Sequence, residues 1–340
     1  MNCIVTGGSG YLGSALINHL LSKSLNIKNF DKVNNKKINV QFEKGDITNL
    51  ERLLEVTKNI DIIYHCVAKV PITKNKKDFK SVNLTGTENI LKAALHNKVK
   101  KIIYISSSAV FGIPKKTPIL EEDERKPIEA YGASKKDGED LCFKYMKQGL
   151  DITIIRPRTI LGSDRLGIFS ILFDWISENK NVPVMNNGQN LYQFIDIRDL
   201  NEAIYKSSLL KGSNVFNIGA EKFSTIFNIL SSCIVNANSK SKIKNIDNNF
   251  LFKMANIISK TNLIPLQDYH FKVYGKSVFF DITKSKTVLN WSPEFSNNES
   301  IINSYQNFIN KKNNRMFEKY STPHNSLLKK GLLKYVHLFI

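Results

Sequence analysis

The chain has 340 residues, 42% of them hydrophobic and 23% charged, a composition that is ordinary for a globular protein with a sizeable core. No run approaches about 18 uninterrupted apolar residues, so no transmembrane helix is expected. The formal net charge is +19, but the lysines are spread along the chain without a basic-aromatic block, and nucleic-acid binding is therefore not expected.

The location of the protein is predicted from its first residues and its cysteines. A strand-like run begins almost at the initiator Met, which leaves no room for a signal peptide. The four cysteines are widely scattered and have no metal-ligand spacing: Cys3, Cys66, Cys142 and Cys233. We therefore expect a cytoplasmic protein with reduced thiols and no metal site.

Short β-branched runs alternate with helical patterns through the first half of the chain, which is typical of a parallel sheet with crossover helices. Strands are expected at 2–6, 26–31, 39–44, 60–66, 101–106 and 151–156, with a seventh at 215–219. Helices are expected at 13–22, 49–57, 83–96 and 130–148. This order predicts an α/β fold of the Rossmann type, with a doubly wound parallel sheet.

The domain organisation follows from these elements. Residues 1–165 are predicted to form the sheet domain, to which the strand at 215–219 returns. Residues 166–192 and 221–310 are predicted to form a smaller, mixed α/β lobe that covers the crevice of the sheet and binds substrate. Residues 311–340 are predicted to form a basic, amphipathic C-terminal tail.

A glycine-rich turn joins the first strand to the first helix. Gly7, Gly10 and Gly13 allow a tight turn, close approach of a pyrophosphate to the backbone, and packing of the helix on the strand. The start of the helix offers unpaired N–H groups to an anion. Asp31, at the end of the second strand, would accept both ribose hydroxyls and repel a 2′-phosphate, which favours NAD over NADP. Lys32 beside it leaves NADP as an alternative.

A tyrosine and a lysine lie four residues apart in the helical pattern at 130–148, so Tyr131 and Lys135 share one face of the helix. Transfer of a hydride from an alcohol needs a base for the hydroxyl proton, and a nearby ammonium favours the phenolate form of tyrosine. The serines of the run Ser106–Ser108 follow a strand and supply hydroxyls at the carboxyl edge of the sheet. Together these residues predict hydride chemistry on an alcohol.

The spacing of the three glycines, the Tyr131–Lys135 pair and segments such as Gly45-Asp46-Ile47 and His65-Cys66-Val67-Ala68 resemble the extended short-chain dehydrogenase/reductase family, over residues 1–160. The resemblance implies that Ser107 completes the catalytic group with Tyr131 and Lys135, with Ser108 as the second choice and a substrate contact. It also implies a cofactor site that includes, besides the residues above, Tyr11, Leu12, Asp46, Ile47, Ala68, Asn83 and Pro157.

The residues at a few single positions limit which of the family's reactions are expected. In this family, the sugar dehydratases and nucleotide-sugar decarboxylases place acidic residues after the catalytic hydroxyl, and Ser108-Ala109 stands here instead. The segment that begins Tyr192-Gln193 resembles the strand-to-helix segment that lines the substrate cleft, and implies that Gln193 binds substrate. Thr159 occupies a position where many sugar epimerases have an asparagine, and is also predicted to contact substrate.

The resemblance therefore favours an NAD-dependent nucleoside-diphosphate-sugar epimerase that acts by transient oxidation of a sugar hydroxyl. The first alternative is an NAD(P)-dependent dehydrogenase or reductase of a sugar or sterol-like alcohol. The second is a non-catalytic, NAD-binding sensor or scaffold. For the tail, two interpretations stay open: peripheral contact with an anionic membrane surface, or docking on the same domain or on the partner in a homodimer.

Overall fold

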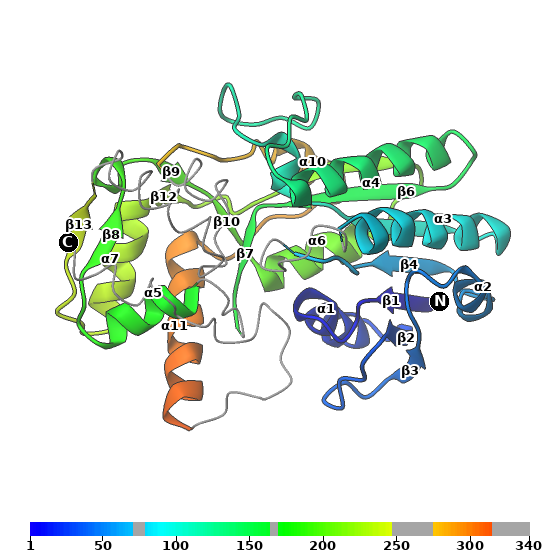
Figure 1. Ribbon diagram of the computed structural model, residues 1–340, viewed down its shortest axis with the longest axis horizontal. Coiled ribbons are helices and arrows are strands. Elements are labelled where there is room, and N and C mark those ends of the chain that lie inside the picture. The colour runs from blue at the N-terminus through cyan, green and yellow to red at the C-terminus, as the bar shows by residue number, and fades with distance from the viewer. Residues whose placement is uncertain (71–78, 164–168, 247–274, 315–340) are drawn as a thin grey trace.

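A seven-stranded, fully parallel sheet forms the centre of the protein (Figure 1). The computed structural model describes residues 1–70, 79–163, 169–246 and 275–314. The strand order is β11-β6-β5-β4-β1-β2-β3. The strands are β1 (Asn2–Thr6), β2 (Asn26–Asp31), β3 (Gln41–Lys44), β4 (Ile62–His65), β5 (Lys101–Ile105), β6 (Ile152–Pro157) and β11 (Asn214–Ile218). The predicted α/β sheet is confirmed, with β3 and β4 shorter than expected.

Helices cover both faces of this sheet. One face is covered by α1 (Tyr11–Leu21) and α6 (Ile197–Leu209), and the other by α2 (Leu50–Val56), α3 (Gly86–His96) and α4 (Ala130–Met146). In β4, Ile62 and Tyr64 belong to the first core, whereas Ile63 belongs to the second. Because successive side chains of a strand point to opposite faces, a strand buried on both sides is apolar throughout.

The chain reverses its direction of winding between β1 and β4, which are neighbours in the sheet. In open α/β sheets, ligands bind in the crevice that opens at this point, outside the carboxyl ends of the strands. The glycine turn follows β1, and a short 3₁₀ helix, η2 (Ser108–Phe111), follows β5. The segments that the sequence singled out therefore lie at the carboxyl edge of the sheet.

A smaller lobe has its own core, formed by aromatic and aliphatic side chains that include Phe173, Phe194, Ile229 and Phe308. It is seen on the left of Figure 1. Its elements are α5 (Phe169–Ser177), β8 (Val182–Val184), the 3₁₀ turn η3 (Asn186–Gly188), β9 (Leu191–Tyr192), β12 (Ser224–Thr225), α7 (Ile226–Asn236), β13 (Ile243–Asn245) and α11 (Asn297–Asn313). The parallel pair of β7 (Thr159–Leu161) and β10 (Phe194–Asp196) connects this lobe to the sheet domain.

Two details differ from the elements expected. The expected helix at 83–96 is preceded by a π-helical turn, η1 (Phe79–Thr85), and α3 begins only at Gly86. Within 221–310, α10 (Thr283–Leu289) and Trp291 pack on α6 and β11 of the sheet domain and not in the smaller lobe. The indole Nε1 of Trp291 donates a hydrogen bond to the Asp199 carbonyl oxygen (3.2 Å), which fixes this segment on the sheet domain.

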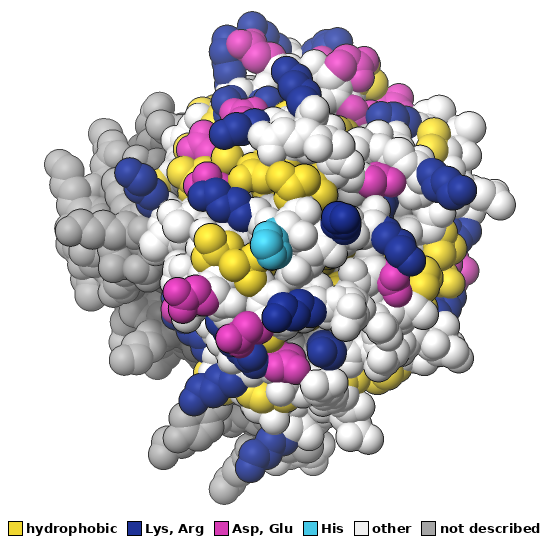
Figure 2. All heavy atoms as spheres, turned by 90° about the vertical axis from the view of Figure 1, so that its right-hand side faces the viewer, with side chains coloured by type: hydrophobic (Ala, Val, Ile, Leu, Met, Phe, Trp, Pro, Cys, Tyr) yellow, Lys and Arg dark blue, Asp and Glu magenta, His cyan; other side chains and the backbone are white. Residues whose placement is uncertain are grey.

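No disulfide joins the four cysteines, all of which lie in the described residues. In the described part of the chain, no helix is both long and apolar enough to cross a bilayer, and no three or more His, Cys, Asp or Glu side chains come together as metal ligands. Figure 2 shows Lys and Arg side chains interspersed with Asp and Glu on one face of the molecule. Residues 164–168, and 315–340 of the predicted tail, lie outside the described residues.

Candidate functional site

The glycine turn after β1 is closed by contacts that no larger residue would allow. Gly7 has φ +72° and lies against the Val67 backbone, and a Cβ on Gly13 would come within 2.2 Å of the Gly7 carbonyl oxygen. Gly10 differs, since a Cβ there meets only the Gly7 oxygen, at 3.1 Å. The helix that follows has no side-chain cap and no acidic residue in its first turn. Its N-terminus therefore presents backbone N–H groups and the positive end of its dipole to an anion.

The adenine end of the predicted cofactor site is formed by two acidic residues. The Asp31 carboxylate accepts hydrogen bonds from the N–H groups of Ser9 (3.1 Å) and Lys32 (2.7 Å), and its burial raises the pKa of the carboxyl group. Lys32 Nζ forms an ion pair with Asp46 Oδ2 (2.6 Å). Burial alone would raise the pKa of Asp46, but Lys32 and the Thr48 N–H lower it. The Lys32 ammonium is therefore paired with a carboxylate of the protein itself, and the two charges compensate each other.

Other residues expected at the cofactor lie around the same crevice. Tyr11 is buried and Leu12 half-buried at the start of α1; Ile47 is buried against Gly86, and Ala68 is half-buried after β4. Asn83 is engaged within the protein: its Oδ1 accepts from the Lys69 N–H (2.7 Å), and its Nδ2 donates to Ser134 Oγ (2.9 Å). In this structure Asn83 ties the segment after β4 to α4.

Lys135 is buried, with 3% of its surface exposed, at the centre of the predicted catalytic group. Its Nζ donates to the Ile105 carbonyl oxygen at the end of β5 (2.7 Å) and lies 5.0 Å from the centre of the Tyr104 ring. Burial lowers the pKa of Lys135 to about 8. A buried ammonium of this kind can change its protonation state close to neutral pH.

Tyr131 lies one turn before Lys135 at the start of α4, where it is half-buried beside Phe79 (ring centroids 6.3 Å apart). The Glu129 carboxylate caps this helix by accepting from the N–H groups of Tyr131 (2.7 Å) and Gly132 (2.6 Å). Gly132 packs so closely on η2 that a Cβ would come within 2.5 Å of the Ala109 carbonyl oxygen. The helix that carries Tyr131 and Lys135 is thus held directly against the serine turn.

The serine turn presents two hydroxyl groups. Ser107 precedes η2 as its N-cap, and its Oγ accepts from the Ala109 N–H (3.1 Å). Ser108 is the first residue of η2, and both serines are half-buried. A serine hydroxyl that accepts one hydrogen bond still has a proton to donate. Ser107 can therefore donate to an oxygen atom placed at the carboxyl edge of the sheet.

Sequence reasoning missed several buried polar residues next to this group. His65 bridges Thr6 Oγ1 (Nδ1, 2.7 Å) and Thr87 Oγ1 (Nε2, 3.1 Å), and burial lowers its pKa to about 3, so the imidazole is neutral. Glu139 is fully buried and paired with Arg156. Glu139 could have been found, because it continues the four-residue spacing of Tyr131 and Lys135 along one face of α4.

The residues expected to bind substrate lie between the sheet and the smaller lobe. Thr159 Oγ1 is 3.2 Å from the Tyr192 hydroxyl. Pro157, which is expected at the cofactor, is buried nearby at the end of β6, beside Ile218. Gln193 is fully buried, and its amide is engaged with the protein backbone: Nε2 donates to the Ala220 oxygen (2.8 Å), and Oε1 accepts from the Phe280 N–H (2.9 Å). The Gln193 side chain therefore connects two backbone segments of the protein. Thr159, by contrast, is half-buried.

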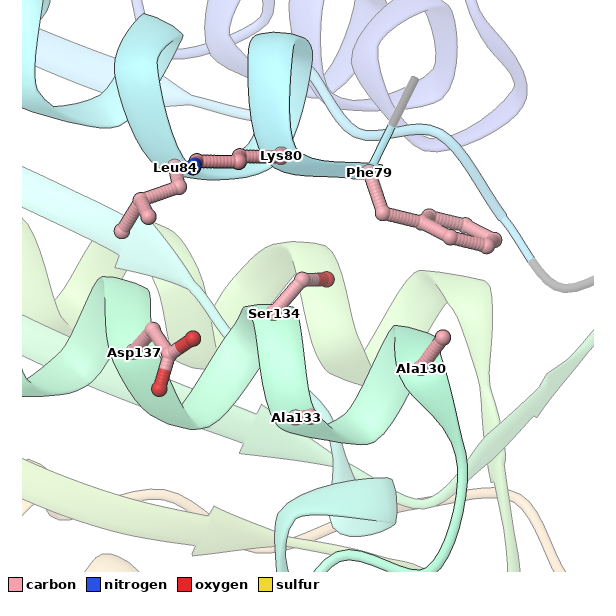
Figure 3. A pocket seen from close by; sticks show the side chains of 7 residues that line it. All are labelled: Phe79, Lys80, Leu84, Ala130, Ala133, Ser134 and Asp137. Atoms are coloured by element: carbon pink, nitrogen blue, oxygen red, sulfur yellow. The ribbon is translucent and has the colours of Figure 1, made fainter. Parts of the chain in front are cut away.

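A hollow of about 300 Å³ lies between η1 and α4 (Figure 3). The side chains of Phe79, Lys80 and Leu84 come from η1, and those of Ala130, Ala133, Ser134 and Asp137 from α4. Most of its lining surface is apolar, and neither Lys135 nor a residue of the serine turn lines it. The candidate site is therefore the carboxyl edge of the sheet and not this hollow.

Comparisons with known proteins identify the family of the chain. The model of the "NAD dependent epimerase/dehydratase family" matches residues 3–219. The uncharacterized protein y4nG of Sinorhizobium fredii is 40% identical over 305 residues, which are 89% of this chain and 77% of that protein. A UDP-glucuronate 4-epimerase of Thermodesulfobacterium geofontis is 26% identical over 324 residues (88% and 93%). The decarboxylating sterol-4-alpha-carboxylate 3-dehydrogenase of Mus musculus is 24% identical over 330 residues (90% of each).

A similar fold is found among solved structures. UDP-glucuronic acid 4-epimerase from Bacillus cereus, in complex with UDP-glucuronic acid and NAD, aligns with a TM-score of 0.74 at 25% identity. The alignment covers 91% of this chain and 99% of that one. The likeness therefore extends over both the sheet domain and the smaller lobe.

Proposed function

Because the chain belongs to the NAD-dependent epimerase/dehydratase family, we propose that it is an NAD-dependent nucleoside-diphosphate-sugar epimerase. The observation that carries the proposal is the buried Lys135, whose Nζ donates a hydrogen bond to the backbone at the end of β5. Lys135 lies one helical turn from Tyr131. This pair lies at the carboxyl edge of the same sheet as the glycine turn. Transient oxidation of a sugar hydroxyl requires a proton acceptor and a dinucleotide site at one edge.

The residues at the glycine turn fit a bound dinucleotide. A Cβ on Gly10 would enter space that the protein itself leaves nearly free, and the uncapped start of α1 suits a pyrophosphate. Asp31, at the end of β2, would hold the ribose hydroxyls, and its negative charge favours NAD over NADP. Because Lys32 is paired with Asp46, its charge is already compensated, which also favours NAD.

The chain's own residues would handle the proton. Tyr131 Oη would take the proton of the sugar hydroxyl and later return it, and the charged Lys135 would stabilise the phenolate between these two events. Ser107 Oγ would donate a hydrogen bond to the same sugar oxygen and orient it. NAD, when bound, would accept the hydride from the sugar carbon and give it back to the opposite face, so that no net oxidation occurs.

The substrate class is supported by the lobe and by one position in the serine turn. Thr159 and Tyr192 lie where the two lobes meet, and the aligned Bacillus cereus epimerase is described as a complex with UDP-glucuronic acid. Ala109 cannot transfer protons in a dehydration, which disfavours that reaction. The similarity to the Mus musculus sterol dehydrogenase supports a second candidate, the net oxidation of a sterol-like or sugar alcohol.

Turnover assays separate the two candidates. The protein, with added NAD, is incubated with a panel of UDP-sugars and sterol-like alcohols, and products are followed by chromatography while NADH is followed by absorbance. An epimerase forms an isomer of the substrate with no accumulation of NADH; steady NADH formation from an alcohol supports the dehydrogenase instead. Tyr131→Phe should slow turnover by about 1,000-fold while NAD stays bound, since it removes the proton acceptor alone. Equal turnover in Tyr131→Phe would exclude the proposed mechanism.

A further inference from the structure

A cluster of buried charges lies one helical turn beyond Lys135. Glu139 is fully buried, and its carboxylate accepts hydrogen bonds from Ser106 Oγ (2.6 Å), Arg125 Nη1 (3.0 Å) and Arg156, which donates through both Nε (2.8 Å) and Nη2 (2.7 Å). Burying ions costs several kcal/mol each, roughly, and well-packed apolar side chains often do as well for stability. Stability alone therefore does not account for this cluster, whereas its position beside Lys135 points to a role in the site.

The cluster and Lys135 hold two consecutive residues at the end of β5. The Ile105 carbonyl oxygen accepts from Lys135 Nζ, and the next residue, Ser106, donates to Glu139. Lys135 and Glu139 are four residues apart on α4, so they meet the strand from the same face of the helix. The serine turn begins at the next residue of the chain, Ser107.

The electrostatic surroundings of Lys135 single out Glu139. The groups that face Lys135 are His65 and Cys66 on β4 and just after it, Tyr104 on β5, and Tyr131, Glu139 and Cys142 on α4. His65 is neutral, and burial raises the pKa of Cys66 to about 12 and the pKa values of Cys142 and Tyr104 well above their usual range. Leaving aside Tyr131, Glu139 is thus the one carboxylic side chain among these described groups, and it accepts hydrogen bonds from two guanidinium groups.

We propose that Glu139 is a positioning residue whose buried carboxylate keeps Lys135 positively charged and holds it against the end of β5. The inference deepens the proposed function, on which it rests, because Lys135 must be charged to favour the phenolate of Tyr131. Arg125 and Arg156 both pair with Glu139, and Arg125 is shared with Asp140. The net field at Lys135 therefore depends on the balance between one carboxylate and two guanidinium groups.

The direct test is the pH at which Lys135 itself titrates. Trace acetylation with acetic anhydride labels only neutral amines, so the extent of labelling of the Lys135 peptide, measured by mass spectrometry against pH, gives its midpoint. In Glu139→Gln we expect this midpoint to fall by about one pH unit. The matched control is Asp140→Asn, since Asp140 also binds Arg125 (2.7 Å) and lies on α4, but its side chain is 43% exposed. We expect no shift in that variant.

Glu139→Gln leaves Arg156 buried without its carboxylate, which can prevent folding. Arg125→Gln avoids this problem, because the Arg125 side chain is 20% exposed and its removal leaves the Glu139–Arg156 pair intact. Here the midpoint of Lys135 should rise, by about half a pH unit. An unchanged or lower midpoint in Arg125→Gln overturns the proposal, as does a Glu139→Gln protein that folds and keeps the original midpoint.

The labelling experiment needs no substrate, so it separates this proposal from the proposed function. If UDP-sugars are not turned over but the two variants shift the midpoint in opposite directions, only the proposed function fails. If turnover is found, its alkaline limb in kcat/KM should move down in Glu139→Gln and up in Arg125→Gln, together with the labelling midpoint. A loss of activity with an unmoved limb would mean that Glu139 is merely structural, and would also overturn the proposal.

Discussion

Lys135 carries a charge that its surroundings disfavour. Burial lowers the pKa of this residue to about 8, and its compensation comes from a carbonyl oxygen, the face of an aromatic ring and a carboxylate one turn away. Such a group costs stability while it is charged, because the unfolded chain binds its proton more tightly than the folded one does. The cost is typical of residues whose charge is needed for chemistry.

A pH dependence follows from the lowered pKa of Lys135. Below about pH 8 the residue keeps its proton and can stabilise the Tyr131 phenolate; above that value the charge is lost. We therefore expect kcat/KM to fall as pH rises through about 8. In Lys135→Arg, whose guanidinium stays charged, the remaining activity should show no alkaline limb near 8. An identical limb in both proteins would assign it to a group other than Lys135.

At the scale of single residues, a sequence reveals functional residues whose partners are close along the chain. Tyr131 and Lys135 are recognisable because their spacing fits one helix face, and Asp31 because it follows a strand. The partners of Glu139 lie 14, 17 and 33 residues away along the chain. No local pattern contains such pairs, which form only when β5, β6 and α4 pack together.

At the scale of the elements, the start of α1 has the strictest requirement for glycine. Gly13→Ala would force a Cβ within 2.2 Å of the Gly7 carbonyl oxygen, whereas Gly10→Ala meets that oxygen only at 3.1 Å. We expect Gly13→Ala to lower the free energy of unfolding by about 3 kcal/mol. Gly10→Ala should fold nearly normally but weaken NAD binding roughly 30-fold, because the methyl group fills the path of the pyrophosphate.

Thermal unfolding and calorimetric titration with NAD test this pair. Two results would contradict these expectations: Gly10→Ala binds NAD as tightly as the native protein does, or both variants lose stability equally. The first result would place the dinucleotide elsewhere, and the second would make Gly10 a packing residue like Gly13.

The elements themselves were largely predictable, since short β-branched runs alternating with helical patterns indicated the order of the seven strands along the chain. The π-helical turn η1 was not, because it is set by packing: Asn83 in this turn is bonded to both Lys69 and Ser134. The place of α10 also depends on tertiary contacts, in which Leu289 and Trp291 complete the core around α6. Its sequence alone does not indicate which lobe it covers.

On the scale of the whole molecule, Arg158 links the sheet domain to the segments that lead into the smaller lobe. It is 3% exposed, and its guanidinium donates to the carbonyl oxygens of Gln193 (3.2 Å) and Val278 (3.0 Å). The Arg158 guanidinium also lies over the rings of Tyr192 and Phe280. Its central carbon, Cζ, is 5.1 and 5.3 Å from the two ring centres. A single side chain just after β6 thus holds segments 35 and 120 residues away along the chain.

Arg158→Met should lower the free energy of unfolding by about 3 kcal/mol, since two buried carbonyl oxygens each lose a charged donor. Arg52→Met is the control, because Arg52 pairs with Glu43 and Glu55 at the surface and should cost at most about 1 kcal/mol. Chemical denaturation measures both values. Equal losses in the two variants would mean that Arg158 contributes no more than a surface ion pair does.

The central claim is that the hydride leaves one carbon of the sugar and returns to the same carbon. A UDP-sugar that carries deuterium at the carbon to be inverted tests this claim directly, with NMR and mass spectrometry of the products in ordinary water. We predict an epimer that retains the deuterium at that carbon, with no label in free NADH. A keto product with deuterium transferred to released NADH, or an epimer that has exchanged its deuterium with water, would contradict the account.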